Sequence, residues 1–391
     1  MNRKFRYFCL LAAAAIAACH PAGKYSSWPA YGGAANIHYS DLREIDTGNV
    51  AGLREAWTYH TGDADSNSQI QANPIIIGHT LYGVSPRLKL FALDAATGRL
   101  QWSFDPATVT SVGIRSLNTC RGVAYYRGSE SDQRLFFAAG HSLYCVDALT
   151  GRLVPGFGEQ GRIDLHNDLG RDVSDLYIAA TTPGVVYKDM LILGDRVAED
   201  ADAAPGHIRA YDVHTGRLRW IFHTIPYPGE AGYNSWDDTA AYRHIGGAND
   251  WSGFSLDAER GIVFAAVGSA SADFYGGRRL GNDLFADCAL ALDANTGKLI
   301  WHFQTIHHDL WDRDPPTPPV LVTVKKEGKS IAAVAQVTKS GLVYLLDRST
   351  GKPIYPVVER PVPDSSELAG ERPAPTQPWP TVMPPFARQS V

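Results

Sequence analysis

One thirteen-residue segment holds an unusual density of groups that can perform acid–base or metal chemistry. Residues 304–316 read QTIHHDLWDRDPP, with two histidines, three aspartates, a tryptophan and an arginine. A carboxylate in this segment could act as a general base toward a hydroxyl group. Two other interpretations stay open. The Asp and His side chains could cap turns of a surface loop, or His-His-Asp could bind a metal, although adjacent histidines rarely converge on one ion.

A repeated phrase indicates the elements that must position this segment. Asp-x-x-Thr-Gly-Arg/Lys occurs five times, beginning at Asp94, Asp147, Asp212, Asp293 and Asp347. An alternating apolar run enters each copy and a second short run leaves it. Glycine supplies the positive φ of a tight turn, and the aspartate can hydrogen-bond the turn backbone. Each copy therefore predicts a β-hairpin.

The ends of the copies predict how these hairpins pack. The fullest copies run from Ala92 to Trp102, from Ala210 to Trp220 and from Ala291 to Trp301. A lone hairpin cannot bury a tryptophan, so we expect each Trp to dock on the next unit. Successive repeats with variable insertions are typical of a repeat architecture whose loops carry the function. We predict an all-β fold of the β-propeller type.

The composition is that of a globular protein. Hydrophobic residues make up 45% and charged residues 20% of the chain, as in ordinary soluble domains. The net charge of −5 gives no reason to expect nucleic acid as a partner. No further apolar run of about 20 residues follows the N-terminus, so no membrane-spanning helix is expected.

The first 19 residues have the features of a targeting segment. Arg3, Lys4 and Arg6 precede an apolar stretch that ends IAAC at Cys19. This ending resembles a bacterial lipobox, which implies cleavage before Cys19 and lipidation of its thiol. An ordinary signal peptide is the alternative. We expect a periplasmic protein, residues 20–391, that is anchored to the membrane only by lipid on Cys19.

The remaining cysteines do not indicate a disulfide framework. Cys120, Cys145 and Cys288 are odd in number. We expect Cys145 and Cys288, on strands entering repeat turns, to be buried small hydrophobic residues. The chain has no Cys-x-x-Cys-His, so no attached c-type haem is expected.

The C-terminal stretch, residues 353–391, is rich in proline. Proline removes ladder donors, so we expect an extended surface loop or tail here and no sixth sheet. About five to six blades are then present. Either strands from the region Trp28–Tyr59 complete the ring, or the ring continues beyond Val391; the second interpretation is favoured.

Several motifs together resemble the pyrroloquinoline quinone (PQQ) dependent dehydrogenases, in particular the eight-bladed glucose/quinate branch. The resemblance covers about Trp28 to the last residue. It rests on HHDLWD (307–312), QVTKSG (336–341), CRGV (120–123), GANDW (247–251) and GSASADFYGG (268–277). In that family the repeat phrase is the tryptophan-docking motif.

The resemblance implies residues that hold PQQ, a planar quinone with three carboxylates. Trp251 is similar to the tryptophan that stacks on the ring. Arg121 would bind a carboxylate or quinone oxygen, and Lys339 would donate to the quinone oxygens. Gln71 stands where the family has a cofactor-contacting Glu, so a neutral hydrogen bond is implied.

The resemblance also implies calcium and a general base. Glu199 aligns with the acidic calcium ligand, and Ser269 stands where methanol-type relatives have an Asn ligand. Asp312, 27 residues before Lys339, matches the family's base, with Asp309 as the alternative. The implied reaction is hydride transfer from a sugar, polyol or cyclic alcohol to PQQ. Electrons would then pass to membrane quinone or a separate cytochrome.

Departures from the family pattern bear on the substrate. Alcohol-type relatives carry adjacent cysteines where this chain has Arg115 and Ser116, and some glucose-type relatives carry a His at the position of Leu117. The resemblance therefore does not single out glucose. A non-catalytic propeller lipoprotein of the outer-membrane barrel-assembly type, and an inactive truncated quinoprotein, remain as alternative hypotheses.

Overall fold

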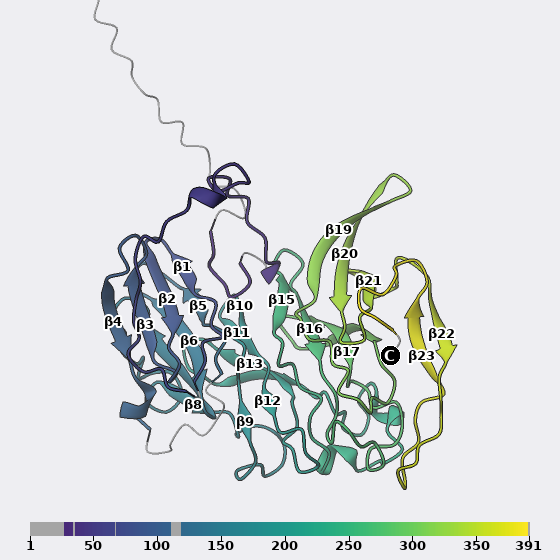
Figure 1. The fold of residues 1–391 in the computed structure, drawn as a ribbon. Coiled ribbons are helices and arrows are strands. Elements are labelled where there is room, and N and C mark those ends of the chain that lie inside the picture. The colour runs from purple at the N-terminus through teal and green to yellow at the C-terminus, as the bar shows by residue number, and fades with distance from the viewer. Residues whose placement is uncertain (1–26, 34–35, 67, 111–118, 390–391) are drawn as a thin grey trace, which may run out of the picture.

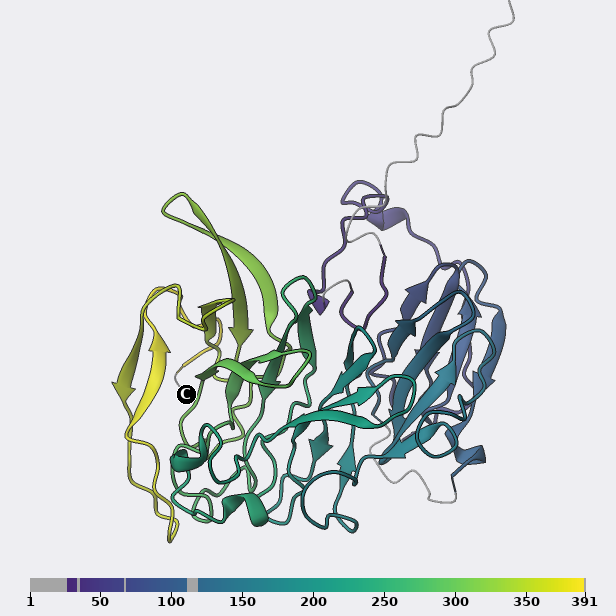
Figure 2. The ribbon, with the colours of Figure 1, turned by 180° about the vertical axis from the view of Figure 1, so that it is seen from behind.

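The computed structural model describes residues 27–33, 36–66, 68–110 and 119–389. The expected targeting segment with Cys19, and the positions Arg115, Ser116 and Leu117, lie outside the described residues. The fold is all-β, and its antiparallel sheets stand side by side in chain order across the molecule (Figure 1). The sheet β1–β4 and the hairpin β22–β23 lie at opposite sides of the molecule in this view and in the view from behind (Figure 2).

Four of these sheets have four strands each, and we call them blades 1 to 4. Blade 1 contains β1 (Ile75–Ile77), β2 (Thr80–Val84), β3 (Leu90–Asp94) and β4 (Leu100–Phe104), and blade 2 contains β5 (Ala124–Arg127), β6 (Gln133–Ala139), β7 (Ser142–Asp147) and β8 (Arg162–Asp164). Blade 3 contains β10 (Val185–Tyr187), β11 (Met190–Leu193), β13 (Ile208–Asp212) and β14 (Leu218–Phe222), and blade 4 contains β15 (Phe254–Asp257), β16 (Ile262–Val267), β17 (Cys288–Asp293) and β18 (Leu299–Gln304).

The remaining elements are smaller. Blade 5 has three strands, β19 (Val320–Lys326), β20 (Lys329–Val337) and β21 (Val343–Asp347), and its β19–β20 hairpin protrudes beyond the neighbouring blades (Figure 1). Two-stranded sheets form from β9 (Ile178–Ala179) with β12 (Arg196–Val197) and from β22 (Val357–Pro361) with β23 (Thr376–Pro380). Short 3₁₀ helices are η2 (Val50–Gly52), η3 (Pro106–Thr108), η4 (Tyr233–Ser235) and η5 (Ala241–Arg243).

The repeat phrase forms the turn that the sequence predicts. In blade 1, Oδ1 of Asp94 accepts hydrogen bonds from the Thr97 amide at 2.9 Å and from its hydroxyl at 2.7 Å. The same pair of bonds recurs in the other four copies. The repeat glycine takes a positive φ, for example +69° at Gly98. Local sequence alone thus specifies this hairpin.

The repeat tryptophans dock on the next blade, as predicted. Trp102 Nε1 donates to the Ala148 carbonyl at 3.1 Å, Trp220 to Ala294 at 3.2 Å and Trp301 to Arg348 at 3.0 Å. Each acceptor directly follows the repeat aspartate of the following blade. The indole also covers that blade's repeat glycine, where an added Cβ would lie 2.4–2.6 Å from the ring. Only glycine leaves room for this packing.

Two segments outside the full repeats pack in related ways. Trp57 of the N-terminal segment docks on blade 1 through its bond to Ala95 O, at 3.3 Å. Blade 2 ends its repeat with Pro155 instead of Trp, and there Gly158 N donates to Thr215 O of blade 3 at 2.9 Å. The apolar core consequently lies between adjacent blades as well as within them.

The proline-rich C-terminal stretch corrects one expectation. We expected a loop without a sheet over residues 353–391, but β22 and β23 pair antiparallel within it. Pro378 and Pro380 lie opposite Glu359 and Val357. These alternate positions direct the proline nitrogens to the edge away from β22, so no ladder donor is lost. The density of prolines therefore did not exclude a two-stranded ribbon.

Cys145 and Cys288 are buried, as predicted, and Cys120 is buried as well; all three are free thiols. Among the described residues, no helix has the length and apolar character needed to cross a bilayer.

Candidate active site

The seven residues singled out by the resemblance all line a single pocket. They are Gln71, Arg121, Glu199, Trp251, Ser269, Asp312 and Lys339, around a volume of about 280 Å³. They come from segments spread over most of the described chain, so the sequence spacing could not show that they meet. The same pocket is also lined by residues to which the sequence analysis assigned no individual role, among them Gln69, Arg196, Asn249, Asp273 and Asp314.

Blade topology explains why these residues converge. Arg121, Trp251 and Asp312 lie in segments that enter the first strands β5, β15 and β19, whereas Lys339 lies in the turn between β20 and β21. In an antiparallel blade, the entry to the first strand and the turn between the second and third strands share one edge. Each blade thus delivers its loops to the same face of the propeller.

Trp251 presents a flat surface with two cations near its ring. The guanidinium carbon of Arg121 and Nζ of Lys339 each lie 5.6 Å from its ring centroid. The backbone carbonyl of Trp251 accepts a hydrogen bond from the Thr182 hydroxyl at 2.6 Å, which ties the backbone at Trp251 to the segment that enters blade 3. A half-buried indole with two cations nearby is suited to an aromatic ligand that carries negative charge.

Two threonine hydroxyls hold the guanidinium of Arg121 in place. Its Nη1 donates to the hydroxyls of Thr181 and Thr182, at 2.8 and 3.2 Å. Burial lowers the pKa of Arg121, but an arginine remains cationic. Neither threonine neutralises the charge, so the fork can bind an anionic group that enters the pocket.

Asp314 connects the main parts of the site, although it was not among the predicted site residues. Its Oδ2 accepts from Trp251 Nε1 at 2.8 Å and from Lys339 Nζ at 3.1 Å. Its Oδ1 accepts from the amide of Ser269 at 2.6 Å and lies 2.9 Å from the hydroxyl oxygen of the same residue. The only signal in the sequence was its position two residues after Asp312. Asp314 therefore positions the indole, the lysine and Ser269 together.

Asp312 forms an ion pair with Lys339 at the pocket wall. The distance from Nζ to Oδ1 is 2.7 Å. Burial raises the pKa of Asp312 to about 6, against the opposing effect of Lys339. Burial lowers the pKa of Lys339, but Asp314 and Asp312 outweigh it, so this pKa lies above its ordinary value. A carboxyl group with a pKa near neutrality is suited to proton transfer.

The alternative base, Asp309, has a different environment. It is 3% exposed, and its oxygens accept from the Ser269 hydroxyl at 2.6 Å and from the amides of Trp311 and Arg313. These bonds cap the loop from within. The turn-capping interpretation thus describes Asp309, whereas Asp312 faces the pocket.

The two histidines of the segment point to separate partners. His307 contacts Gln304 at 2.7 Å and Glu359 at 3.2 Å. His308 is buried, with Nδ1 3.2 Å from Asp283. Within the described part of the chain, neither belongs to a group of side chains that could share one ion. The His-His-Asp metal hypothesis is therefore not supported by the geometry.

One wall of the pocket is acidic. Burial, and then Asp314, Asp312 and Glu199, raise the pKa of Asp273 to about 8. Glu199 and Asp273 are also joined through the backbone, where Asp273 N donates to Glu199 O at 3.2 Å. Such mutual repulsion among carboxylates is what a bound hard cation relieves. The donors present, carboxylates and carbonyl oxygens, fit calcium.

Ser269 also lines the pocket, and its hydroxyl already contacts three carboxyl groups. Its hydroxyl is 2.6 Å from Asp309, 2.9 Å from Asp314 and 3.3 Å from Asp287. A hydroxyl has only one proton to donate. Burial, and then Asp309 and Asp314, raise the pKa of Asp287 well above its usual range. Ser269 therefore offers at most a lone pair to an ion.

The pocket can be compared with known proteins. The PQQ family model, described as glucose/ethanol/alcohol dehydrogenase, beta-propeller domain, matches residues 28–391. The chain belongs to this family. The propeller fold and the grouping of Trp251, Arg121 and Lys339 agree with that membership.

Curated members of the PQQ family are similar over most of this chain. Quinoprotein glucose dehydrogenase A of Acinetobacter calcoaceticus is 35% identical over 386 residues, covering 90% of this chain and 47% of the relative. Quinate/shikimate dehydrogenase (quinone) of Acinetobacter baylyi is 32% identical over 409 residues, covering 95% of this chain and 49% of the relative. The chain thus spans about half the length of the curated relatives it matches.

Solved structures of the PQQ family share the fold. Quinohemoprotein alcohol dehydrogenase of Comamonas testosteroni has a TM-score of 0.72 at 26% identity, covering 92% of this chain and 52% of that chain. Quinohemoprotein alcohol dehydrogenase ADHIIG of Pseudomonas putida HK5 has a TM-score of 0.70 at 27% identity, covering 85% of this chain and 49% of that chain.

Proposed function

We propose that this chain contributes the active site of a PQQ- and calcium-dependent dehydrogenase that oxidises a sugar, polyol or cyclic alcohol. The observation that carries the proposal is the convergence of Trp251, Arg121, Lys339 and Asp312 on one pocket with an acidic wall. When bound, PQQ supplies the acceptor for the hydride that leaves the alcohol carbon. The protein's own residues must then bind and orient the cofactor and remove the proton of the substrate hydroxyl.

Binding falls to the aromatic and cationic groups. Trp251 offers the stacking surface, and Asp314 holds its ring through Nε1. Arg121 and Lys339 supply positive charge for carboxylate and quinone oxygens. Gln71 lines the same pocket and contributes a neutral hydrogen bond. Because an aromatic surface and two cations line the same pocket, they could fix both the position and the plane of a flat, anionic cofactor.

The ion would be held by the acidic wall. Glu199 and Asp273 provide carboxylate oxygens, and Ser269 lies beside them. Calcium accepts carboxylate, carbonyl and hydroxyl oxygens at flexible geometry. Its charge would offset the repulsion that raises the pKa of Asp273.

Asp312 acts as the general base in this proposal. Its carboxylate would take the hydroxyl proton of the substrate as the carbon loses hydride. Lys339 stabilises the ionised form through the 2.7 Å contact. A base positioned in this way typically contributes about 10²–10⁴ in rate.

The electron acceptor and the location of the protein are part of the same proposal. Membrane quinone or a separate cytochrome would reoxidise the cofactor, since no haem-attachment motif occurs in the chain. The basic and apolar N-terminal residues support export to the periplasm with a lipid on Cys19.

The test is to add PQQ and calcium to the purified protein. Cofactor binding is followed by quenching of tryptophan fluorescence, and turnover by dye-linked oxidation of a panel of sugars, polyols and cyclic alcohols. We expect Asp312→Asn to keep binding and to lose about 10²–10⁴ in turnover. Asp309→Asn serves as the comparison, because its carboxylate caps the loop.

Each result decides part of the proposal. Failure of the wild-type protein to bind PQQ in the presence of calcium would refute it. Binding with equal turnover in wild type and Asp312→Asn would refute Asp312 as the base. Binding without turnover by the wild type would leave a cofactor-binding propeller that needs residues from outside this chain.

A further inference from the structure

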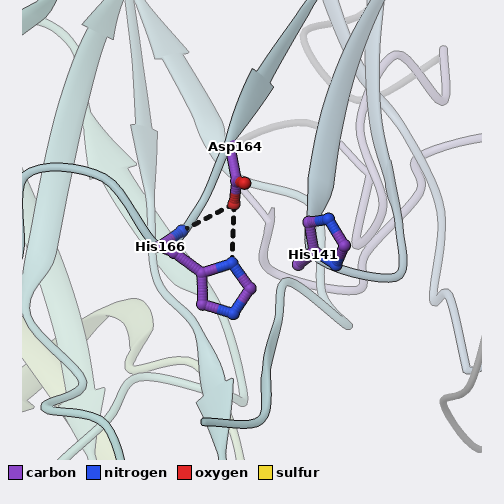
Figure 3. Close-up of side chains that lie close together, drawn as sticks. All are labelled: His141, Asp164 and His166. Carbon is purple, nitrogen blue, oxygen red and sulfur yellow. Dashed lines mark hydrogen bonds and ion pairs between the residues drawn. The ribbon is translucent and has the colours of Figure 1, made fainter. Parts of the chain in front are cut away.

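Blade 2 carries a second group of potential ligands, outside the pocket. The ligand atoms of His141, Asp164 and His166 all lie within 4.8 Å of one another. His166 Nδ1 is 2.7 Å from Asp164 Oδ1. The His141 ring lies beside this pair, with its centroid 4.9 Å from that of His166 (Figure 3). None of the three lines the PQQ pocket.

Local strand pairing holds these residues together. His141 lies in the turn between β6 and β7, and Asp164 is the last residue of β8. Ser142, the residue after His141 and the first of β7, pairs with Asp164 of β8. Leu165 N then donates to His141 O at 2.8 Å. The backbones that carry the three side chains are thus fixed before any ligand binds.

The hydrogen bonds of His166 leave one proton unaccounted for. Nε2 lies 3.0 Å from the carbonyl of Leu176 and Nδ1 lies 2.7 Å from the Asp164 carboxylate. Both partners are acceptors, whereas a neutral imidazole has a single N–H. With the proton on Nε2 for the carbonyl, Nδ1 and Asp164 face each other with lone pairs. A second proton, or a metal cation bound beside both atoms, would relieve this repulsion.

His141 provides the third donor. Its side chain is half-buried, and within the described residues its ring has no hydrogen-bond partner that would occupy a nitrogen. In Figure 3 the ring stands next to the Asp164–His166 pair and comes from a different turn. Two imidazoles and one carboxylate therefore surround the position where the missing positive charge is needed.

We propose that His141, Asp164 and His166 bind a divalent transition-metal ion, with zinc as the reference ion. Imidazole with carboxylate is a donor set typical of zinc and its neighbours, whereas calcium and magnesium prefer oxygen ligands alone. Ligands of a tetrahedral zinc ion lie roughly 3.3 Å apart. To reach that spacing the 2.7 Å contact between His166 Nδ1 and Asp164 Oδ1 would open slightly, and the His141 ring, whose ligand atom lies within 4.8 Å of the other two, would move closer.

The chemistry of the site follows from its ligand count. Three protein ligands leave the fourth position to water. The Asp164 side chain is 46% exposed, so the ion can enter from solvent and exchange. The Leu176 carbonyl orients the His166 ring from outside, which is the usual arrangement around a metal-bound histidine.

The site shares an edge of blade 2 with the PQQ pocket. The β6–β7 turn, the end of β8 and the entry to β5 lie at one edge, because the strands alternate in direction. Arg121 lies three residues before β5 begins at Ala124. The ion would therefore tie together the loops of the blade that delivers Arg121.

The experiment is calorimetric titration of zinc into chelator-treated protein, with calcium in excess to occupy the acidic pocket. We expect one zinc ion per chain, and at least a tenfold weaker affinity in His141→Ala. Cobalt gives a second readout, since a tetrahedral site with nitrogen ligands shows visible absorption. His244→Ala is the matched control, because His244 pairs with Asp238 at 2.6 Å without a second histidine.

Equal zinc affinity in wild type, His141→Ala and His244→Ala would overturn the proposal, as would no zinc binding by the wild type. Asp164→Ala is a second variant in case His141→Ala does not fold, since Asp164 is partly exposed. A zinc-induced rise in Tm that is lost in Asp164→Ala would support the site. The same rise in Asp164→Ala would refute it. PQQ binding is not needed for either readout.

Discussion

The ammonium group of Lys339 lies 2.7 Å from Oδ1 of Asp312. This contact joins the turn between β20 and β21 to the segment that enters β19, so two loops of blade 5 present one charged unit to the pocket. Trp251 of blade 4 completes the arrangement through Asp314, which both Lys339 and the indole contact. Proton transfer and cofactor binding would therefore depend on the same small set of contacts.

The first prediction concerns the pH dependence of turnover. The pKa of Asp312 is raised to about 6, mainly by burial, and Lys339 opposes this rise. A base must be ionised, so kcat/KM should increase as the pH rises through about 6. Lys339→Met removes the opposing charge, so this rising limb of the pH profile should move to higher pH. The substitution should also lower kcat/KM.

The measurement is kcat/KM from pH 5 to 9 for wild type and Lys339→Met, with saturating PQQ. Lys339→Arg is the control that keeps the positive charge, and its limb should stay close to that of the wild type. A limb that moves to lower pH in Lys339→Met would contradict the ion-pair interpretation.

The second prediction concerns the docking of blades. Gly351 has φ +69°, and an added Cβ would lie 2.6 Å from the Trp301 ring. Gly351→Ala should therefore suffer both backbone strain and a clash with a buried indole. Gly328→Ala, with φ +76° and nothing within 4 Å of the added Cβ, suffers the strain alone. We expect Gly351→Ala to be less stable than Gly328→Ala by about 1–3 kcal/mol.

Urea unfolding of the two variants, with wild type as reference, gives the difference in the free energy of unfolding. Similar values for both variants would mean that the Trp301 ring yields to the methyl group without loss. Docking of the indole on the glycine would then contribute little to the stability of the propeller.

The third prediction concerns acid stability. Burial, and then the neighbouring His223, hold the pKa of His207 well below its usual value. His207 Nδ1 accepts from Thr224 N at 3.2 Å, so the ring must be neutral. Unfolding frees it to take up a proton below pH of about 6.5. The folded state does not gain this proton, so stability should fall as the pH drops below that value.

The loss attributable to His207 should approach about 1.4 kcal/mol per pH unit. His207→Gln keeps an acceptor for Thr224 but does not titrate. Free energies of unfolding at pH 7.5 and 5.5 should therefore differ less in His207→Gln than in the wild type. An identical pH dependence of the two proteins would show that His207 does not contribute.

The fourth prediction concerns calcium. Glu199 lines the acidic wall with Asp273, so Glu199→Gln should raise the calcium concentration needed for PQQ binding by roughly tenfold, as for loss of a charged ligand of a cation. Glu259→Gln, an exposed position on the surface, is the control. PQQ binding that is independent of calcium in the wild type would rule out the ion as part of the site.

Much of the fold was predictable because its decisive interactions are local or periodic. The Asp–Thr–Gly turn closes within six residues, and its side-chain bonds need no distant partner. The terminal Trp could be assigned to the next blade because its size forbids burial on a single hairpin. The hairpin β22–β23 was missed, since proline counts do not show which edge of a strand each ring nitrogen faces.

The sequence by itself determined the repeats, the blade units and the residues that the family resemblance marks. Only the tertiary structure decided which further carboxylates line the pocket beside those residues. Asp314 and Asp273 enter the site because neighbouring blades fold their loops onto one face, and Asp309 is turned away by its bonds to Ser269 and to its own loop. His141 and Asp164 are likewise brought together by strand register across β7. Contacts between residues far apart in sequence depend on chain geometry, which a list of residue types does not contain.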